Sequence, residues 1–199
     1  MREIIKMIVV LTVLSAFSGG LLAAVRGGTM DKIEYQQLVF VKGPAIRTIL
    51  EGCSNDPIVD RFKIKDGDIE RSFFVGIFDG KANTVAFEGI GKGFGGDIGL
   101  MVGVNIDNDK IVGMGVTTHS ETPGIGSKAK TDPKFSNQFK GLAAIEPCKV
   151  KPDGGEIDAI SGATVTSRGV CVGVTNAANI YKRLKPQIAE KIKEFKQGV

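Results

Sequence analysis

The stretch RSFFVGIFDGKANTVAFEGI, residues 71–90, decides the fold of this chain. Its two arms follow a period of two and are separated by Asp79-Gly80, a pair that suits a tight reversal. This pattern predicts an antiparallel hairpin. Residues 59–64 (VDRFKI) extend the pattern before it, through a turn at Asp66-Gly67-Asp68. A second hairpin over residues 98–119, turning at Asp107-Asn108-Asp109, extends it afterwards. An antiparallel sheet is therefore expected at the centre of the chain.

Helices are expected before and after these strands. Residues 31–50 carry apolar side chains at three- and four-residue intervals, with Asp31 as the cap and a break near Gly43-Pro44. After the sheet, the pattern predicts a short helix over 133–139, a polar loop ending at 156 with a strand-like segment over 155–160, and a final helix over 165–196 interrupted by Pro186. The inward face of the final helix is expected to hold Val170, Cys171, Val174, Ala177, Tyr181 and Leu184. Strands in the middle and helices at the ends define the α+β class.

The first residues of the chain are apolar. No charged residue lies between Met7 and Val25, and this stretch approaches the roughly 20 residues that span a bilayer core. We expect an uncleaved membrane anchor over residues 1–28 and one domain over 29–199. The alternative is a cleaved secretory signal ending near Ala23 and Ala24. Charges flanking the stretch are nearly balanced, and we expect the domain on the extracytoplasmic side, as is usual after an N-terminal signal-anchor.

Composition excludes several classes of function. The 199 residues include 26 basic and 22 acidic side chains without a long block of one sign, so nucleic acid is not an expected partner. Three scattered cysteines and the single histidine, His119, argue against a zinc site or an iron-sulfur cluster built by this chain alone. No catalytic triad can be argued around His119, although a secreted hydrolase that uses it is a third, less favoured interpretation.

The segment DAISGAT, residues 158–164, lies where the final helix is expected to begin. The first turn of a helix leaves backbone N–H groups unpaired and carries a partial positive charge, which suits a phosphate. In any protein, Ser161 or Thr164 could instead serve only as the helix cap. Both interpretations are open on spacing alone.

The run D-x-x-S-G-A-T resembles the flavinylation motif of the FMN-binding domain family. Members of this family include the G subunit of the Rnf electron-transport complex and the C subunit of the sodium-translocating NADH:quinone oxidoreductase. Two further segments agree with the Rnf protein. Residues 119–126, HSETPGIG, are similar to its H-x-E-T-P-G-L-G segment and depart from it at Ile125. Residues 91–96, GKGFGG, match its G-x-G-Y-G-G segment, with Phe94 in place of Tyr.

The resemblance implies a cofactor and its attachment site. Thr164 would receive FMN from FAD as a phosphoester, through a magnesium-dependent flavin transferase. The resemblance places the other flavin contacts in the same three segments. They are Asp158, Ser161, Gly162 and Ala163, then Glu121, Thr122, Gly124 and Ile125, and finally Gly93 and Phe94. It implies neither a catalytic residue nor a metal ligand in this chain.

The implied function is electron transfer. The chain would be one component of a membrane-bound, ion-translocating oxidoreductase of the ferredoxin:NAD type in the plasma membrane of a prokaryote, crossing it once. Its partners would be the other membrane and iron-sulfur subunits of that complex, and the coupling ion could be sodium or the proton. The alternative is a membrane-tethered binding or assembly module without a covalent cofactor.

Overall fold

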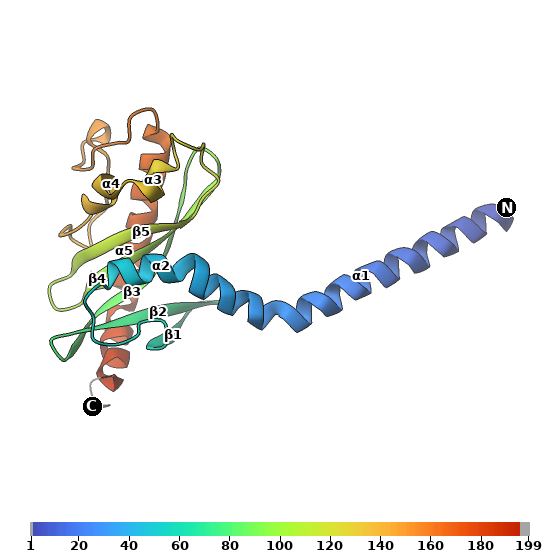
Figure 1. Cartoon of the computed structure of the whole chain (residues 1–199), viewed down its shortest axis with the longest axis horizontal. Coiled ribbons are helices and arrows are strands. Elements are labelled where there is room, and N and C mark those ends of the chain that lie inside the picture. The colour runs from blue at the N-terminus through green and yellow to red at the C-terminus, as the bar shows by residue number, and fades with distance from the viewer. Residues whose placement is uncertain (1, 196–199) are drawn as a thin grey trace. The chain divides into compact units, whose positions relative to one another are not determined.

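A computed structural model describes residues 2–195 of the chain (Figure 1). The chain divides into two compact units, Met1–Val39 and Phe40–Val199. The first unit is helix α1, Arg2–Gln36, whose part Arg2–Met30 is long and apolar enough to cross a membrane, with a mean hydropathy of 2.3.

Helical structure continues beyond α1 without interruption. The π-helical segment η1, Gln37–Lys42, follows α1, and α2, Gly43–Ile49, follows η1. The expected helix start at Asp31 is therefore wrong, since the helix begins near the N-terminus, and so is the expected break near Gly43-Pro44. Pro44 lies in the first turn of α2. The wide π turn before it fits a proline ring that would otherwise collide with the carbonyl of Phe40.

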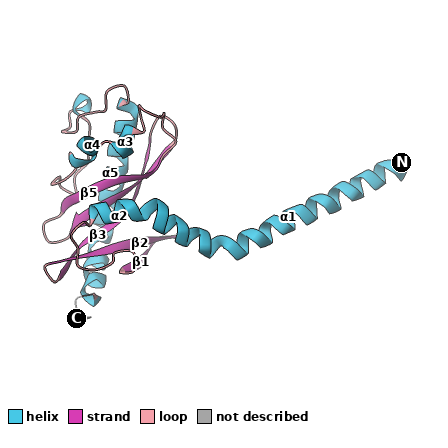
Figure 2. Ribbon diagram, viewed as in Figure 1, coloured by secondary structure: helices cyan, strands magenta, loops and turns pink. Residues whose placement is uncertain are grey.

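Five strands form one antiparallel sheet, which confirms the prediction (Figure 2). The order in space follows the chain, and every neighbouring pair is a hairpin. Gly67 and Asp79-Gly80 take positive φ in the first two turns, as tight reversals require. The strands are β1 (Arg61–Asp66), β2 (Ile69–Phe78), β3 (Lys81–Lys92), β4 (Asp97–Asn105) and β5 (Lys110–Thr118).

Helices cover both faces of the sheet. On one face α2 packs against β4 and β5, and on the other α5, Thr164–Glu194, runs across β3 and β4. Seven consecutive residues of β4 are buried, because neither face of this strand meets water. The six residues expected on the inward face of the last helix are all buried, which confirms that prediction.

Two glycine pairs bring α5 against the sheet. Gly89 and Gly91 on β3 face Gly169 and Gly173 on α5. A methyl group added at Gly91 would overlap the carbonyl oxygen of Gly169, and one added at Gly169 would lie 2.6 Å from the carbonyl oxygen of Lys92. The backbones therefore touch where α5 begins, which holds its N-terminus beside the turn that follows β3.

The remaining elements are short. They are α3 (Lys128–Thr131), α4 (Pro133–Asn137) and the 3-10 turn η2 (Lys151–Asp153). The strand-like segment expected over 155–160 is only one parallel bridge between Val150 and Ile157. Pro186 does not interrupt α5. Because Pro186 has no N–H, the carbonyl of Lys182 loses its helical hydrogen-bond partner. Both residues are exposed, so water replaces the missing hydrogen bond.

Candidate functional site

Thr164 is the first residue of α5. Its neighbour Ala163 occupies the cap position and has no side chain that could cap the helix. Within residues 2–195, the hydroxyls of Ser161 and Thr164 have no hydrogen-bond partner, so neither of them caps the helix. The backbone N–H groups of Thr164, Val165 and Thr166 also lack partners in that part of the chain, as is usual for a first turn. The helix end thus presents free donors beside a free hydroxyl.

The turn before Thr164 is held by a residue that our sequence interpretation missed. The buried hydroxyl of Ser167 accepts a hydrogen bond from the Ile160 N–H at 2.9 Å and donates one to the Ala163 carbonyl at 3.0 Å. Gly162 takes φ of 77°, which a glycine adopts without strain. Ser167 stands three residues before Val170, so the helical period of the apolar face could have identified it as inward.

A buried carboxylate joins the three segments that resemble the FMN-binding family. Glu121 is only 5% exposed. Its Oε1 accepts the Gly95 N–H at 2.8 Å, and its Oε2 accepts a short hydrogen bond from the hydroxyl of Thr166 on α5. The Glu121 N–H donates to Nδ1 of His119 at 3.2 Å. The structure therefore brings the turn after β3, the segment after β5 and the start of α5 into one site.

Glycines allow these segments to pack closely. A methyl group on Gly93 would overlap Oε1 of Glu121, and a methyl group on Gly126 would lie 2.8 Å from Cβ of Glu121. A methyl group on Gly95 would overlap the carbonyl oxygen of Ser120. The two glycine-rich motifs therefore enclose the Glu121 side chain.

Exposed apolar side chains surround this site. Phe94 is 75% exposed, Val165 48% and Ile125 47%. Ile125 lies beside Gly162, since a methyl group there would be 3.7 Å from its Cγ2. Thr122 and Gly124 are exposed as well. Each of the three segments therefore leaves an apolar side chain open to solvent, and those of Val165 and Ile125 lie next to residues 162–164.

Basic side chains near the site in sequence are already paired. Two hydrogen bonds of 2.7 Å join Arg168 to Asp153, and they lower the pKa of Asp153 and raise that of Arg168. Lys151 pairs with Asp158 at 2.7 Å, while the Asp158 N–H donates to Gln138. The helix N-terminus itself adds positive character close to Thr164.

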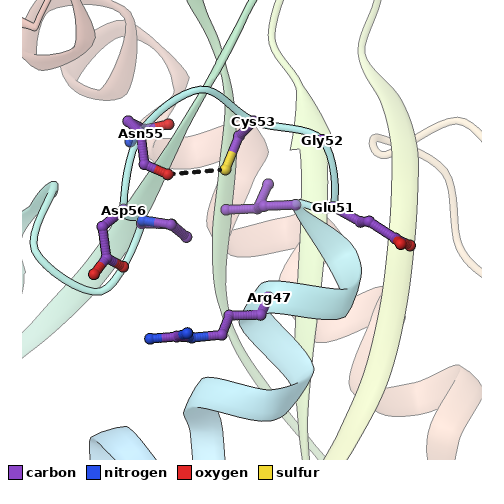
Figure 3. A pocket seen from close by; sticks show the side chains of 8 residues that line it. Arg47, Glu51, Gly52, Cys53, Asn55 and Asp56 are labelled. Carbon is purple, nitrogen blue, oxygen red and sulfur yellow. Dashed lines mark hydrogen bonds between the residues drawn. The ribbon is translucent and has the colours of Figure 1, made fainter.

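Two surface pockets lie away from these motifs. The smaller, of about 380 Å³, is at the end of α2 (Figure 3). It is lined in part by Arg47, Cys53 and Asn55, and Cys53 Sγ donates to the Asn55 carbonyl oxygen at 3.3 Å. The other, of about 610 Å³, lies near Phe78 and Lys140. Neither contains a residue of the three motifs.

Within residues 2–195, no hydroxyl or thiol is hydrogen-bonded to the imidazole of His119. Its only side-chain hydrogen bond within residues 2–195 is the one accepted from the Glu121 backbone. A hydrolase of the Ser-His or Cys-His kind requires a hydroxyl or thiol bonded to the imidazole. The arrangement does not support that interpretation.

Comparison with known proteins defines the class. A family model described as an FMN-binding domain matches residues 93–179, which contain most of the glycine-rich turn and the whole of the other two motifs. The C subunit of a Na⁺-translocating NADH-quinone reductase from Parabacteroides distasonis shares the fold, with a TM-score of 0.57 and 24% identity over 81% of this chain and 96% of that one. Residues 93–179 therefore match the FMN-binding domain family, and the chain shares the fold of that subunit.

Relatives of similar length identify the family more closely. The G subunit of the ion-translocating oxidoreductase complex from Methanosarcina acetivorans is 32% identical over 180 residues, which are 89% of this chain and 94% of that protein. Its counterpart from Vibrio cholerae is 27% identical over 90% of each chain. The chain belongs to this G-subunit family. This membership and the apolar helix α1 together indicate membrane anchoring.

Proposed function

We propose that this chain carries electrons on an FMN joined by a phosphoester to Thr164, as the G subunit of an ion-translocating oxidoreductase of the ferredoxin:NAD type. The observation that carries the proposal is the position of Thr164, the first residue of a 31-residue helix within the matched FMN-binding domain. Its hydroxyl is free, and the segments that resemble the family converge beside it.

The start of α5 fits a phosphate diester. Such a group keeps one negative charge, and the free N–H groups of the first turn together with the helix dipole stabilise it. At an exposed helix end this is worth about 0.3–1 kcal/mol, too little to retain a cofactor against dilution. A covalent bond supplies the retention that the helix end cannot.

Attachment would proceed by group transfer from FAD on a magnesium-dependent flavin transferase. Thr164 Oγ forms the new oxygen–phosphorus bond while the bond between the two phosphates of FAD breaks. AMP leaves with the bonding electron pair, and the threonine proton passes to solvent. Thr164 is half-buried, and its place beside the exposed Ser161 and Gly162 leaves it accessible to a second protein.

A flavin held at Thr164 would supply one-electron transfer, and the chain would supply its orientation. Phe94, on the glycine-rich turn, and Ile125, beside Gly162, provide exposed apolar surface. Gly93 and Gly124 allow close approach of the backbone, and Thr122 lies exposed in the same segment as Gly124. Glu121 acts as a positioning residue, because both of its carboxylate oxygens are used within the chain. Ser161, Gly162 and Ala163 shape the turn, and Asp158 holds Lys151.

The proposal also covers location and partners. Residues 1–28 would anchor the chain once in the plasma membrane of a prokaryote, with residues 29–199 on the extracytoplasmic side. The electron donors and acceptors would be other membrane and iron-sulfur subunits of the complex. Covalent attachment suits a carrier outside the cytoplasm, where lost FMN is not easily replaced.

The test is flavin fluorescence of the full chain after co-expression with a flavin transferase. On a denaturing gel under ultraviolet light, the wild type should give a fluorescent band and Thr164→Val none, because valine has no oxygen to esterify. Ser161→Ala should weaken the band without moving the attachment site. Thr131→Val, a change at an exposed threonine of α3, is the matched control and should keep full fluorescence.

Mass spectrometry of the peptide containing Thr164 completes the test. It should show the mass of FMN on Thr164 in the wild type. Fluorescence that survives in Thr164→Val would show that the acceptor is another residue. A wild type without any covalent flavin would favour the membrane-tethered binding or assembly module instead.

A further inference from the structure

A single threonine joins the loop before α5 to the helix itself. The Cys148 N–H donates to Oγ1 of Thr175 at 2.9 Å, and the Thr175 hydroxyl donates to the carbonyl oxygen of Cys171 at 2.9 Å. Thr175 follows Cys171 by one helical turn. Cys148 is therefore fixed opposite the turn of α5 that carries Cys171.

Both cysteines pack at the same hydrophobic core. Cys171 is buried at 2% exposure in the hydrophobic core, and Cys148 is half-buried against that same core. Interaction with the Cys171 thiol lowers the pKa of Cys148, and the same interaction, together with burial, raises the pKa of Cys171. The pair thus consists of a more accessible sulfur with a lowered pKa and a buried sulfur with a raised one, so Cys148 is the one expected to react first.

We propose that Cys148 and Cys171 form a reversible disulfide by exchange with a small-molecule disulfide. The Cys148 thiolate attacks one sulfur of the oxidant, and the oxidant's other half leaves as a thiolate. Cys171 then gives up its proton and attacks the Cys148 sulfur, which releases the second half of the oxidant. Two protein thiols are oxidised, and one small-molecule disulfide is reduced to two thiols.

The bond would close the segment that leads to Thr164. Residues 148–171 include the 3-10 turn η2, the turn at Gly162 and the first two turns of α5. Ser167 already fixes the end of that turn, and the disulfide would tie the start of the loop to the helix. Oxidation therefore restricts the loop that presents Thr164, whether or not that residue carries a cofactor.

Cys53 serves as an internal control. Its thiol donates to the Asn55 carbonyl oxygen at the end of α2, where it lines a pocket whose other residues all lie between positions 47 and 57 (Figure 3). Cys53 is the one cysteine of the chain outside the proposed pair, and it should keep a free thiol when the other two are oxidised.

The experiment uses the full chain in detergent, treated with oxidised glutathione. Free thiols are then blocked with N-ethylmaleimide under denaturing conditions, and the protein is digested without reduction. Mass spectrometry should find a cross-linked peptide pair that joins Cys148 to Cys171 and a maleimide only on Cys53. Dithiothreitol should restore all three thiols, and Cys53→Ser should form the same cross-link.

Two further variants test the order of events. Cys171→Ser should stop at a glutathione adduct on Cys148, whereas Cys148→Ser should leave Cys171 unmodified. The labelling pattern of the oxidised wild-type protein already tests the proposal, without any substitution. Maleimide on both Cys148 and Cys171 after oxidation, or a cross-link to Cys53 or between two copies, would overturn it.

Discussion

The buried carboxylate of Glu121 accepts a hydrogen bond from the hydroxyl of Thr166, which lies 45 residues later in the chain. Its other oxygen accepts the Gly95 N–H, 26 residues earlier. One side chain therefore connects the two glycine-rich motifs to the start of α5. Within residues 2–195 no backbone hydrogen bond joins these three segments directly, so Glu121 aligns them together with the close contact of β3 and α5.

Glu121→Ala is expected to lower the free energy of unfolding by about 2 kcal/mol, because it leaves the buried Thr166 hydroxyl without its acceptor and also removes the acceptor of the Gly95 N–H. Glu121→Gln should cost less, since an amide oxygen can still accept that N–H. Denaturant titration of the full chain in detergent measures the free energy of unfolding of both variants. Glu190→Ala, at an exposed glutamate of α5, is the control. Equal losses for Glu121→Ala and Glu190→Ala would contradict the structural role given to Glu121.

Gly91→Ala tests the contact between β3 and α5. The added methyl group would overlap the carbonyl oxygen of Gly169, so the helix must move away from the strand. We expect a loss of about 3 kcal/mol, at the upper end of the usual cost of overpacking. Gly113→Ala is the matched control, because its added methyl group would find its nearest neighbour at an ordinary 3.5 Å. Urea midpoints that fall equally in both variants would argue against this close approach.

The strands could be predicted from sequence because local patterns determine them. The period of two in residues 71–90 and the Asp79-Gly80 turn are short-range features, and the sheet has the predicted hairpins. The inward face of α5 was equally predictable, because burial follows the helical period from Val170 to Leu184. Local chemistry was sufficient in both cases.

The bonding within the site was not predictable in the same way. Glu121 finds its partners far along the chain, and no local pattern marks a carboxylate that binds Gly95 and Thr166. Proline was the second source of error. Both Pro44 and Pro186 suggest breaks, yet helical structure continues at each, because the cost of a missing N–H depends on the surroundings of the freed carbonyl.

The lowered pKa of Asp66 predicts that the stability of the fold depends on pH in the acid range. Hydrogen bonds from Arg183 at 2.6 Å and Arg71 at 2.7 Å lower the pKa of Asp66 from 3.8 to about 2. A carboxylate with a depressed pKa stabilises the folded state above pH 3.8, and this contribution is lost as the pH falls through about 2. These bonds join β1, β2 and α5.

Asp66→Asn should therefore be less stable than the wild type at neutral pH, and the difference should shrink as the pH falls from 3.8 to about 2. Urea midpoints of the two proteins across this range measure the effect. Asp68→Asn, in the exposed turn after β1, should not reproduce it. A difference between Asp66→Asn and wild type that stays constant with pH would show that the charge of Asp66 is not the cause.

Phe94→Ala tests the exposed apolar side chain of the glycine-rich turn, and this prediction rests on the proposed flavin. Phe94 is 75% exposed, so its loss should change the free energy of unfolding by no more than about 0.5 kcal/mol. With flavin on Thr164, the variant should have a higher reduction potential than the wild type, because water reaching the ring stabilises the negative charge gained on reduction. Fluorescence quenching by iodide should also increase.

Ile69→Ala removes another exposed apolar side chain, at the start of β2, and is the matched control for Phe94→Ala. If potential and quenching are the same in Phe94→Ala, Ile69→Ala and the wild type while the flavin stays on Thr164, Phe94 does not contact the flavin and the glycine-rich turn serves only to hold Glu121.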